Sequence, residues 1–358
     1  TYLSQEMMSR KFGRQRHGEG GRENLPKALD RFRSDFQVEG YLEHQGQKFV
    51  ARFDANSYLH ITRAIDEYDL VERFGSLEKA LQPIRAKLLV VALSEDWLFP
   101  PEESQELANA MLAVRKPVSY CRLIAPHGHD AFLVDIKNLS NLIRAFLPWV
   151  RENASTAQRN AGADSSRCDY DIIHGMIRPG TRVLDIGCGD GSLLKHLASR
   201  LGIQGMGVDI DLSNITSVID KGFDVFQDDI DEGLAMFPDY SYDYAILSET
   251  LQVVRRPRDL LREMLRVAKE GIVTFTNFGK WSYRLQLLLS GRMPKGRALP
   301  FEWYNTPNIH LFTLKDFMEL CRQDGIRILE TVCIHDCLLC RLFKAVGLEN
   351  LDDILWDI

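Results

Sequence analysis

Two residues suited to proton transfer lie about thirty positions apart in the first half of the sequence. Asp96 follows the apolar run Lys87–Leu93, and His129 lies in the segment IAPHGHDAF at 124–132. A carboxylate behind an imidazole fixes the tautomer of the ring and stabilises the imidazolium that forms when a hydroxyl group loses its proton. The pair therefore indicates nucleophilic catalysis, with Asp96 as the acid and His129 as the base. The spacing alone equally allows Asp96 as a helix cap and His129 as a surface residue.

A glycine-rich segment in the second half, VLDIGCGDGSLL at 183–194, carries a different chemistry. Gly187, Gly189 and Gly191 alternate after an apolar run that contains Asp185, and leucines at helical spacing follow. Glycine lets the backbone approach a ligand where a Cβ atom would clash, and the N-terminus of the following helix favours anionic groups. The segment differs from the dinucleotide fingerprint because a serine occupies the position of its third glycine.

Two more aspartates extend this pattern. Asp209 ends the next expected strand, where a carboxylate can accept both hydroxyls of a ribose, and Asp229 follows the third strand in FQDDID, in a position for the adenine amino group. In this order, Asp185, the glycines and the two aspartates predict a binding site for S-adenosylmethionine. The alternative is a Rossmann-like sheet with an empty or different pocket. The segment SETLQVV at 248–254 would face the sulfonium and offers Ser248, Glu249 and Gln252, but no histidine or lysine as a base.

The elements that must position these residues alternate between strand and helix patterns. The expected strands end just before the candidate residues, at the carboxyl edge where α/β proteins build their sites. They are Lys87–Leu93, Val118–Ile124, Arg182–Ile186, Gly205–Asp209, Asp224–Gln227, Tyr242–Leu247 and Gly271–Thr276. The helices expected after the first and third of these strands are Pro100–Arg115 and Ser192–Leu201. Such alternation predicts parallel sheets covered by helices on both faces. The polar stretch 153–167 reads as a linker between two domains.

Composition and charge exclude several classes of protein. A hydrophobic fraction of 45% in 358 residues suits two globular domains, and a net charge of −6 gives no general attraction for nucleic acid. No apolar run reaches the roughly 18–20 residues of a membrane span. Seven irregularly placed cysteines fit a reducing cytoplasm better than a disulfide framework. We therefore expect a cytoplasmic protein that contacts neither nucleic acid nor membrane.

Three smaller features have competing interpretations. The segment CIHDCLLC at 333–340 has spacings that a zinc site could use, but strand alternation favours small core residues, so we predict no metal. The basic and aromatic stretch 280–297 is interpreted as a solvated lid over the cofactor, with RNA contact as the alternative. Cys188 is interpreted as a space-filling residue of the glycine segment.

The order of Asp96 and His129 matches the second half of the Ser…Asp…His order of α/β-hydrolases. No G-x-S-x-G segment occurs in the chain, which begins at Thr1 without an initiator methionine. We therefore expect the front of a hydrolase-type domain, including its nucleophilic serine, to lie upstream.

Four segments of the first half resemble the homoserine O-acyltransferases. They are TYLSQEMMSRKFGR at 1–14, RFDANSYLHITRAIDEYDL at 52–70, SEDWLFPPEES at 94–104 and GHDAFL at 128–133. These α/β-hydrolases acylate the hydroxyl of L-homoserine from an acyl-CoA in methionine biosynthesis. The resemblance implies that Asp96 is the triad acid, that His129 is the base and that Asp130 holds the homoserine ammonium. It also implies a homodimer, and it places upstream most of the residues that choose an acetyl or succinyl donor.

Four segments of the second half resemble the methionine biosynthesis protein MetW, a family with a class I methyltransferase fold. They are YDYAILSETLQ at 242–252, EMLRVAKEGIVTFTNFGKW at 263–281, GRMP at 291–294 and WYNTPNIHLFTLKDF at 303–317. MetW proteins are encoded beside homoserine O-acyltransferases, which implies a separate acyltransferase as a further partner.

Together these observations predict an α/β protein made of a partial α/β-hydrolase domain followed by a Rossmann-like class I methyltransferase domain. The expected boundaries are 1–152, the linker 153–167, 168–340 and a tail at 341–358. The expected function is acyl transfer from acyl-CoA to L-homoserine through an acyl-serine, joined to a domain that binds S-adenosylmethionine. A further hypothesis is that this domain senses S-adenosylmethionine, a downstream product of the pathway, and adjusts the acyltransferase. The alternatives are an S-adenosylmethionine-dependent methyltransferase and a non-enzymatic sensing partner with a degenerate hydrolase scaffold.

Overall fold

The computed structural model describes most of the chain in two compact units. The described residues are 4–13, 15, 36–134, 136–147, 168–296, 299–333 and 354–357. One unit comprises residues 1–116 and 122–140, and the other comprises residues 117–121 and 141–358. The predicted linker 153–167 lies outside the described residues, and the domain boundaries stay a prediction. None of the helices in the described part is long and apolar enough to cross a membrane.

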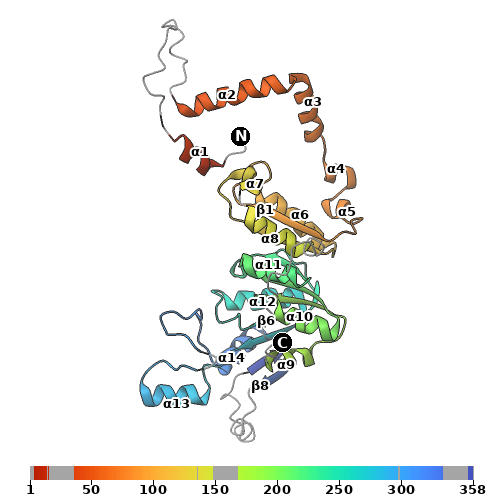
Figure 1. Ribbon diagram of the computed structural model, residues 1–358. Helices are drawn as coiled ribbons and strands as arrows, with labels where there is room; N and C mark the ends of the chain where they lie inside the picture. The colour runs from red at the N-terminus through yellow and green to blue at the C-terminus, as the bar shows by residue number, and fades with distance from the viewer. Residues whose placement is uncertain are drawn as a thin grey trace, which may run out of the picture. The chain divides into compact units, whose positions relative to one another are not determined.

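The first unit begins with a series of helices that precede its first strand (Figure 1). They are α1 (Gln5–Lys11), α2 (Gln37–Arg52), α3 (Ala55–Asp66), α4 (Leu70–Phe74) and α5 (Leu77–Leu81). Side-chain caps start several of them: the Asp54 carboxylate accepts the Ser57 N–H of α3 at 2.8 Å, which satisfies a donor that the helix leaves unpaired. Helices α2, α3 and α4 bury no side chain.

Strands and helices then alternate around the predicted catalytic pair. The elements are β1 (Leu88–Leu93), α6 (Pro101–Ala113), β2 (Val118–Leu123), the 3-10 turn η3 (Gly128–Asp130), α7 (Ala131–Val134) and α8 (Ile136–Phe146). Pro101 opens α6, where its missing N–H costs nothing, and Glu102 and Glu103 lie near the positive end of the helix dipole. The sequence predicted both strands and α6 to within two residues at either end.

The second unit is built on a mostly parallel sheet. Its strands are β3 (Arg182–Ile186), β4 (Gln204–Asp209), β5 (Asp224–Gln227), β6 (Tyr242–Ser248), β7 (Ala268–Phe275), β8 (Glu330–Cys333) and β9 (Ile354–Asp357). Their order is β5-β4-β3-β6-β7-β9-β8, and only β9 runs antiparallel to its neighbours. The order reverses between β3 and β6, and such a reversal opens a crevice at the carboxyl ends of the strands. This topology confirms the predicted Rossmann-like fold of the second half.

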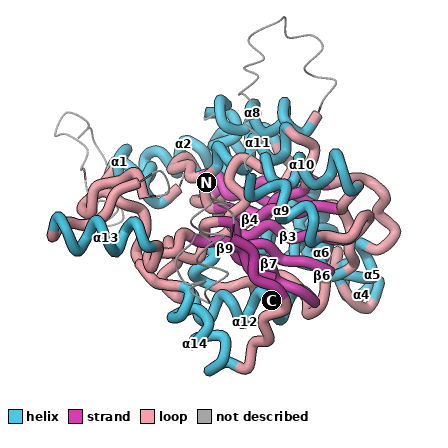
Figure 2. Tube along the Cα trace, turned by 90° about the horizontal axis from the view of Figure 1, so that it is seen from below, coloured by secondary structure: helices cyan, strands magenta, loops and turns pink. Residues whose placement is uncertain are grey.

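Helices cover both faces of this sheet, with α10 and α11 on one face and α12 and α14 on the other (Figure 2). The helices of the unit are α9 (Cys168–Met176), α10 (Ser192–Leu201), α11 (Leu212–Asp220), α12 (Pro257–Val267), α13 (Trp281–Ser290) and α14 (Leu314–Asp324), with the 3-10 turn η5 (Ile230–Glu232). Leu194 and Leu197 of α10 are fully buried against Val183 of β3 and Ile246 of β6. The leucines that follow the glycines in the sequence are therefore the core-facing side of α10.

The C-terminal segment and Gln252 differ from what the sequence predicted for them. Residues 341–358 were expected as a tail, yet the structure places β9 there, between β7 and β8. Gln252 was expected at the ligand edge, but it is 2% exposed and its Nε2 donates to the Thr276 carbonyl oxygen at 2.8 Å. The segment 333–340, for which the sequence predicted small core residues and not a zinc site, lies outside the described residues, apart from the backbone of Cys333 in β8.

Replacing Leu197 with alanine should lower the free energy of unfolding by about 2–5 kcal/mol, because the substitution leaves a cavity in the core between α10 and the sheet. Chemical denaturation measures this value. The matched control is Leu288→Ala on α13, where the side chain is 80% exposed and the expected change stays within about 0.5 kcal/mol. Equal losses in the two variants would contradict the assigned core.

Candidate functional sites

The first unit brings Asp96 and His129 into direct contact. The Nδ1 atom of His129 lies 2.9 Å from Oδ2 of Asp96, across thirty-three residues of sequence. The other carboxylate oxygen of Asp96 accepts the backbone N–H groups of Leu98 at 2.9 Å and Phe99 at 3.1 Å. With Nδ1 donating to a carboxylate, the neutral ring carries its lone pair on Nε2, which is the arrangement that a general base needs.

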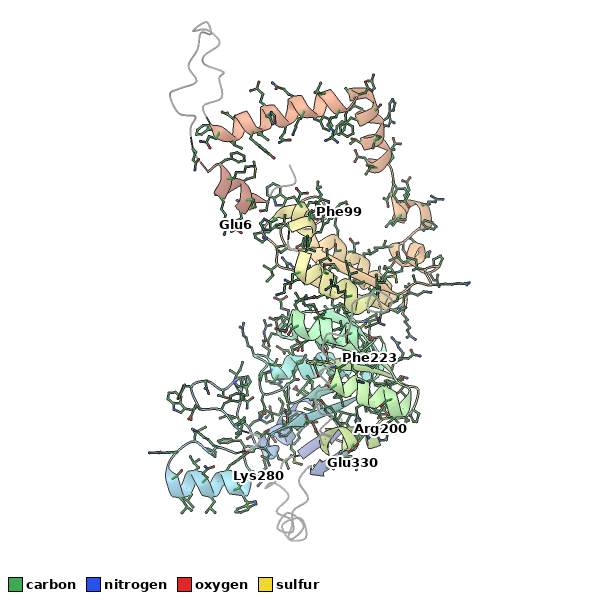
Figure 3. All side chains as sticks on the ribbon, viewed as in Figure 1. Glu6, Phe99, Arg200, Phe223, Lys280 and Glu330 are labelled. Carbon is green, nitrogen blue, oxygen red and sulfur yellow. The ribbon has the colours of Figure 1, made fainter. Side chains whose placement is uncertain are left out.

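The surroundings keep Asp96 ionised. Its side chain is 5% exposed, and burial opposes the charge, but the hydrogen bonds from His129, Phe99 and Leu98 outweigh this effect and lower the pKa of Asp96. The His129 ring is 25% exposed and packs against Phe99, labelled in Figure 3, at 5.4 Å between ring centroids. A buried carboxylate thus supports a partly accessible imidazole.

Polar contacts that the sequence did not predict hold the two loops in place. The Ser94 backbone N–H donates to the Leu123 carbonyl oxygen at 2.9 Å, and the Ser94 Oγ accepts the Ala125 N–H at 3.0 Å. Ser4, which caps α1 and is fully buried, donates its hydroxyl to the carbonyl oxygen of Pro126. The Ser94 contacts connect the loop that carries Asp96 to the loop that carries His129, and the Ser4 contact attaches the start of α1 to the His129 loop. Nothing in the spacing of single serines signals them.

Asp130 directly follows His129 in the turn η3 and is half-buried. Gly128, with φ of +68°, starts this turn in a conformation that other residues rarely adopt. Asp130 therefore lies beside the predicted base, and its role in holding an ammonium group stays a prediction.

The second site lies at the carboxyl ends of β3 and β4. We call residues 187–191 the glycine loop, since all three of its glycines have positive φ: +74° at Gly187, +54° at Gly189 and +78° at Gly191. A Cβ atom would come within 2.7 Å of the Thr250 side chain at Gly187 and within 2.9 Å of Val218 at Gly191. At Gly189, by contrast, an added Cβ would meet no atom within 4 Å. The middle of the loop thus borders open space, which is the cradle that a bound ligand requires.

Asp209 connects the glycine loop to the end of β4. Its Oδ2 accepts the Gly189 N–H at 2.9 Å, and its Oδ1 accepts the Asp211 N–H at 2.9 Å and Nδ2 of Asn214 at 3.1 Å. The side chain is 8% exposed. A carboxylate oxygen has room for more than one donor, so this geometry is compatible with the predicted contact to ribose hydroxyls.

Asp185 and Cys188 complete the floor of this site. Burial, together with the nearby Asp209, raises the pKa of Asp185 to about 7. Burial and the neighbouring carboxylates also raise the pKa of the Cys188 thiol far above its ordinary value, so it carries no thiolate. The sulfur of Cys188 occupies the space over Gly207, where a Cβ atom would lie 2.5 Å from it. This contact supports the interpretation of Cys188 as a space-filling residue.

The end of β5 adds two aspartates. Asp229 caps the turn η5 by accepting the Asp231 N–H at 3.0 Å. Its neighbour Asp228 is linked to β4, because its N–H donates to the Asp209 carbonyl oxygen at 3.2 Å, and burial raises the pKa of Asp228 to about 6. The structure therefore gathers Asp185, the glycine loop, Asp209 and Asp229 at the ends of three adjacent strands. Asp228 was missed, although the doubled aspartate in FQDDID could have drawn attention to it.

Glu249, which the sequence placed at the ligand edge, directly follows β6 and has an unusual backbone conformation. It has φ of +57°, and its N–H donates to the carbonyl oxygen of Thr274 at 3.1 Å and to Oγ1 of the same residue at 2.9 Å. A positive φ at a non-glycine residue is costly and concentrates at functional sites. The strained position lies directly before Thr250, the residue that packs against Gly187.

Comparison with known proteins identifies both halves of the chain. Residues 167–350 match the family model of methionine biosynthesis protein MetW. A bifunctional methionine biosynthesis protein MetXA/MetW of Rhodopirellula baltica is 36% identical over 345 residues, which cover 93% of this chain and 54% of that protein. The chain thus spans about half the length of this relative.

Two relatives match a smaller share of the chain. A homoserine O-succinyltransferase of Cupriavidus taiwanensis is 45% identical over 42% of this chain and 37% of its own length. A homoserine O-acetyltransferase of Methanocorpusculum labreanum is 44% identical over 44% of this chain and 31% of its own length. The matched family model and these relatives lead to one conclusion: the chain belongs to the MetW family of methionine biosynthesis proteins and carries its MetW domain behind a portion homologous to homoserine O-acyltransferases.

Proposed function

We propose that this protein acts in methionine biosynthesis by joining acyl transfer to L-homoserine with binding of S-adenosylmethionine. The observation that carries the first activity is the 2.9 Å contact between the His129 imidazole and the buried Asp96 carboxylate. Homology to two homoserine O-acyltransferases supports the same assignment, and their names include both an acetyl and a succinyl donor.

In this proposal His129 moves protons and Asp96 keeps it in the correct tautomer. His129 Nε2 takes the proton of the serine hydroxyl that attacks the acyl-CoA thioester, and it returns this proton to the departing thiolate of coenzyme A. It next takes the proton of the homoserine hydroxyl, whose oxygen attacks the acyl-serine, and returns it to the serine. Asp96 stabilises the imidazolium in both steps. Asp130 would hold the substrate ammonium from the adjacent position.

The shape and charge of the glycine loop and the aspartates around it support S-adenosylmethionine as the ligand of the second unit. The open space at Gly189 would receive the ligand, Asp209 would accept the ribose hydroxyls, and Asp229 would meet the adenine amino group. The partly protonated Asp185 lies buried beneath the loop, where a cationic ligand would favour its ionised form. When bound, S-adenosylmethionine would supply a methyl group on a sulfonium centre, or it would act as a signal of the pathway's output.

The proposal also includes contact with another protein chain and a cytoplasmic location. Large apolar side chains are exposed on α2 and α3, among them Val50, Leu59 and Ile65. Exposed apolar surface of this kind supports contact with another chain, either a second copy or a separate acyltransferase. The buried free cysteines Cys121, Cys188 and Cys321 support the cytoplasm as the compartment.

Replacing Asp96 with asparagine should lower kcat for acyl transfer to L-homoserine roughly 10³–10⁴-fold, because the amide stabilises the wrong tautomer of His129. The protein as its own cell makes it is assayed by coenzyme A release, with acetyl-CoA and succinyl-CoA in parallel. Glu95→Gln, a change in the same loop, should stay close to the wild-type rate. Retention of most activity by the Asp96 variant would refute the assigned triad.

Calorimetric titration of the chain with S-adenosylmethionine should show one site. Asp209→Asn should weaken binding by about 10- to 100-fold, because it removes the charge from the hydrogen bonds to the ribose hydroxyls. Asp220→Asn, at the exposed end of α11, serves as the control and should bind like the wild type. The absence of binding to the wild-type chain would overturn the proposal. Formation of S-adenosylhomocysteine with a pathway metabolite would assign methyl transfer, whereas a change in acyl-transfer rate upon titration would assign sensing.

Binding of S-adenosylmethionine should strengthen as the pH rises from 6 to 8. Asp185, with a pKa near 7, is partly protonated in the free protein, and a cationic ligand releases that proton, so affinity rises at most about tenfold per pH unit. Folding raises the pKa of Asp185, so its protonated form stabilises the folded chain relative to the unfolded chain. This contribution is present at low pH and is lost as the pH rises through 7. Titrations in two buffers of different ionisation enthalpy count the released proton. An Asp185→Asn variant that kept the full pH dependence would disprove this assignment.

A further inference from the structure

One face of helix α11 points toward the S-adenosylmethionine site. Asn214, Ser217, Val218 and Lys221 lie at spacings of three and four residues, so they share one side of the helix and of its C-terminal cap. Each of the four contacts the glycine loop or Asp209. None of them was singled out from the sequence, because their partners lie far away along the chain.

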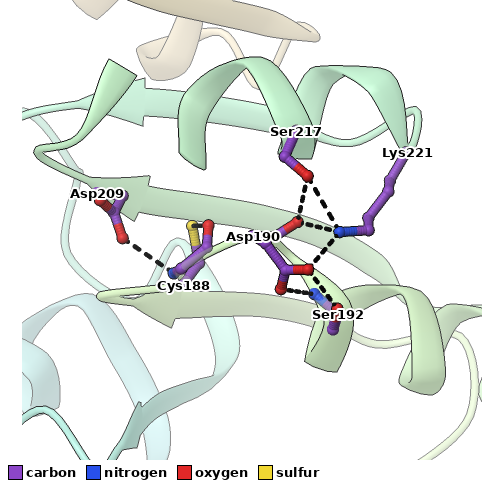
Figure 4. A network of polar contacts seen from close by, with 7 residues as sticks. Cys188, Asp190, Ser192, Asp209, Ser217 and Lys221 are labelled. Atoms are coloured by element: carbon purple, nitrogen blue, oxygen red, sulfur yellow. Dashed lines mark hydrogen bonds and ion pairs between the residues drawn. The ribbon is translucent and has the colours of Figure 1, made fainter. Parts of the chain in front are cut away.

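Lys221 makes the most extensive of these contacts (Figure 4). Its Nζ lies 2.8 Å from Oδ2 of Asp190 in the glycine loop, and it also donates to the carbonyl oxygen of Asp190. The same ammonium donates to Oγ of Ser217 at 3.1 Å, and this hydroxyl donates to the Asp190 carbonyl oxygen at 3.2 Å. The Lys221 side chain is 18% exposed, whereas the Asp190 side chain is 59% exposed, so the lysine end of this ion pair is the shielded one.

The Asp190 carboxylate also fixes the start of α10. Its Oδ1 accepts the Ser192 N–H at 3.1 Å, and its Oδ2 accepts the Ser192 hydroxyl at 2.7 Å. Hydrogen bonds from Lys221 and Ser192 lower the pKa of Asp190 despite its partial burial, so the carboxylate remains charged at neutral pH. Asp190 is therefore held by its backbone and its side chain, from α11 on one side and from α10 on the other.

Two further contacts connect the loop to α11. Gly191 lies so close to Val218 that a Cβ atom would come within 2.9 Å of it, and Asn214 fixes the carboxylate of Asp209 that accepts the Gly189 N–H. The loop is thus attached to α11 directly at Asp190 and Gly191 and, through Asp209, at Gly189. Of its three glycines, Gly189 is the one that borders open space. A site whose backbone is already ordered loses less entropy when a ligand binds.

We propose that Lys221 is a positioning residue that holds the glycine loop in its binding conformation before S-adenosylmethionine arrives. This inference rests on the proposed function of the second unit. Lys221 acts through Asp190 and does not itself touch the ligand. The Lys221–Asp190 contact therefore raises affinity by preorganising the loop.

Lys221→Met keeps the aliphatic stem and removes the ammonium. In the full chain this variant should weaken binding of S-adenosylmethionine about tenfold, and Lys221→Arg should restore most of the loss. The matched control is Lys269→Met, which breaks an ion pair of the same 2.8 Å length with Asp243. The control should bind within twofold of the wild type. An affinity of Lys221→Met within twofold of the wild type would overturn the inference.

Hydrogen exchange separates positioning from general stabilisation. Without ligand, the amides of residues 187–192 should exchange faster in Lys221→Met than in the wild type, while amides of β6 and β7 stay unchanged. Added S-adenosylmethionine should slow the loop amides again. Unchanged loop exchange would overturn the inference even if the wild type failed to bind the ligand, so the two proposals fail separately. If Lys221→Met does not fold, Asp190→Asn and Ser217→Ala test the same contacts, and normal loop exchange and affinity in both would count against the inference.

Discussion

One hydrogen bond, from the Gly189 amide to the Asp209 carboxylate, joins the ends of β3 and β4, and the second unit is arranged around it. The loop that carries this amide has positive φ angles at its three glycines, a conformation that glycine adopts without strain. Strands β3 and β4 run parallel and in register, with Asp185 opposite Gly207 and Ile186 opposite Val208. On its other side β3 pairs with β6, where the strand order reverses and a crevice opens at the carboxyl ends of the strands.

Burial and charge at this edge follow from the same arrangement. Asp185 lies within the strand and loses its hydration, whereas Asp190 lies in the loop and gains a lysine, so the pKa values of two aspartates five residues apart move in opposite directions. Glycine at 207 leaves room for the Cys188 sulfur, which fills the space under the loop. The site thus combines the buried, partly protonated Asp185, the charged Asp190 that Lys221 holds in place, and open space at Gly189.

The first unit also positions a functional side chain through a fixed carboxylate. The carboxylate of Asp96 is buried and accepts three hydrogen bonds, which leaves the His129 ring oriented and partly accessible. Serine contacts at Ser4 and Ser94 hold the loops that carry the pair. In both units, therefore, a carboxylate at the end of a strand is fixed by backbone N–H groups and in turn positions the group next to it.

The local spacing of apolar residues and glycines predicted many of the strands and helices that carry the two sites. The strand Arg182–Ile186 and the helix Ser192–Leu201 agree at both ends with their predicted bounds, because an apolar run, glycines and leucines at helical spacing all indicate the same elements. The contact of Asp96 with His129 followed from their places after two strands. Helix α2 was not predicted, since it buries no side chain and shows no clear apolar face, and β9 was missed because its pairing with β7 joins residues about eighty positions apart. Lys221 and Ser4 were missed for the same reason: tertiary contacts, which no local spacing encodes, give them their roles.

The open edge at Gly189 is the central feature of the proposed binding site, and a crystal structure of the chain grown with S-adenosylmethionine tests it most directly. We expect density for the ligand over the glycine loop, with ribose hydroxyls within hydrogen-bonding distance of the Asp209 carboxylate and the loop backbone unchanged. Density for the ligand elsewhere, or a glycine loop that must rearrange to admit it, would show that this edge is not a preformed binding site.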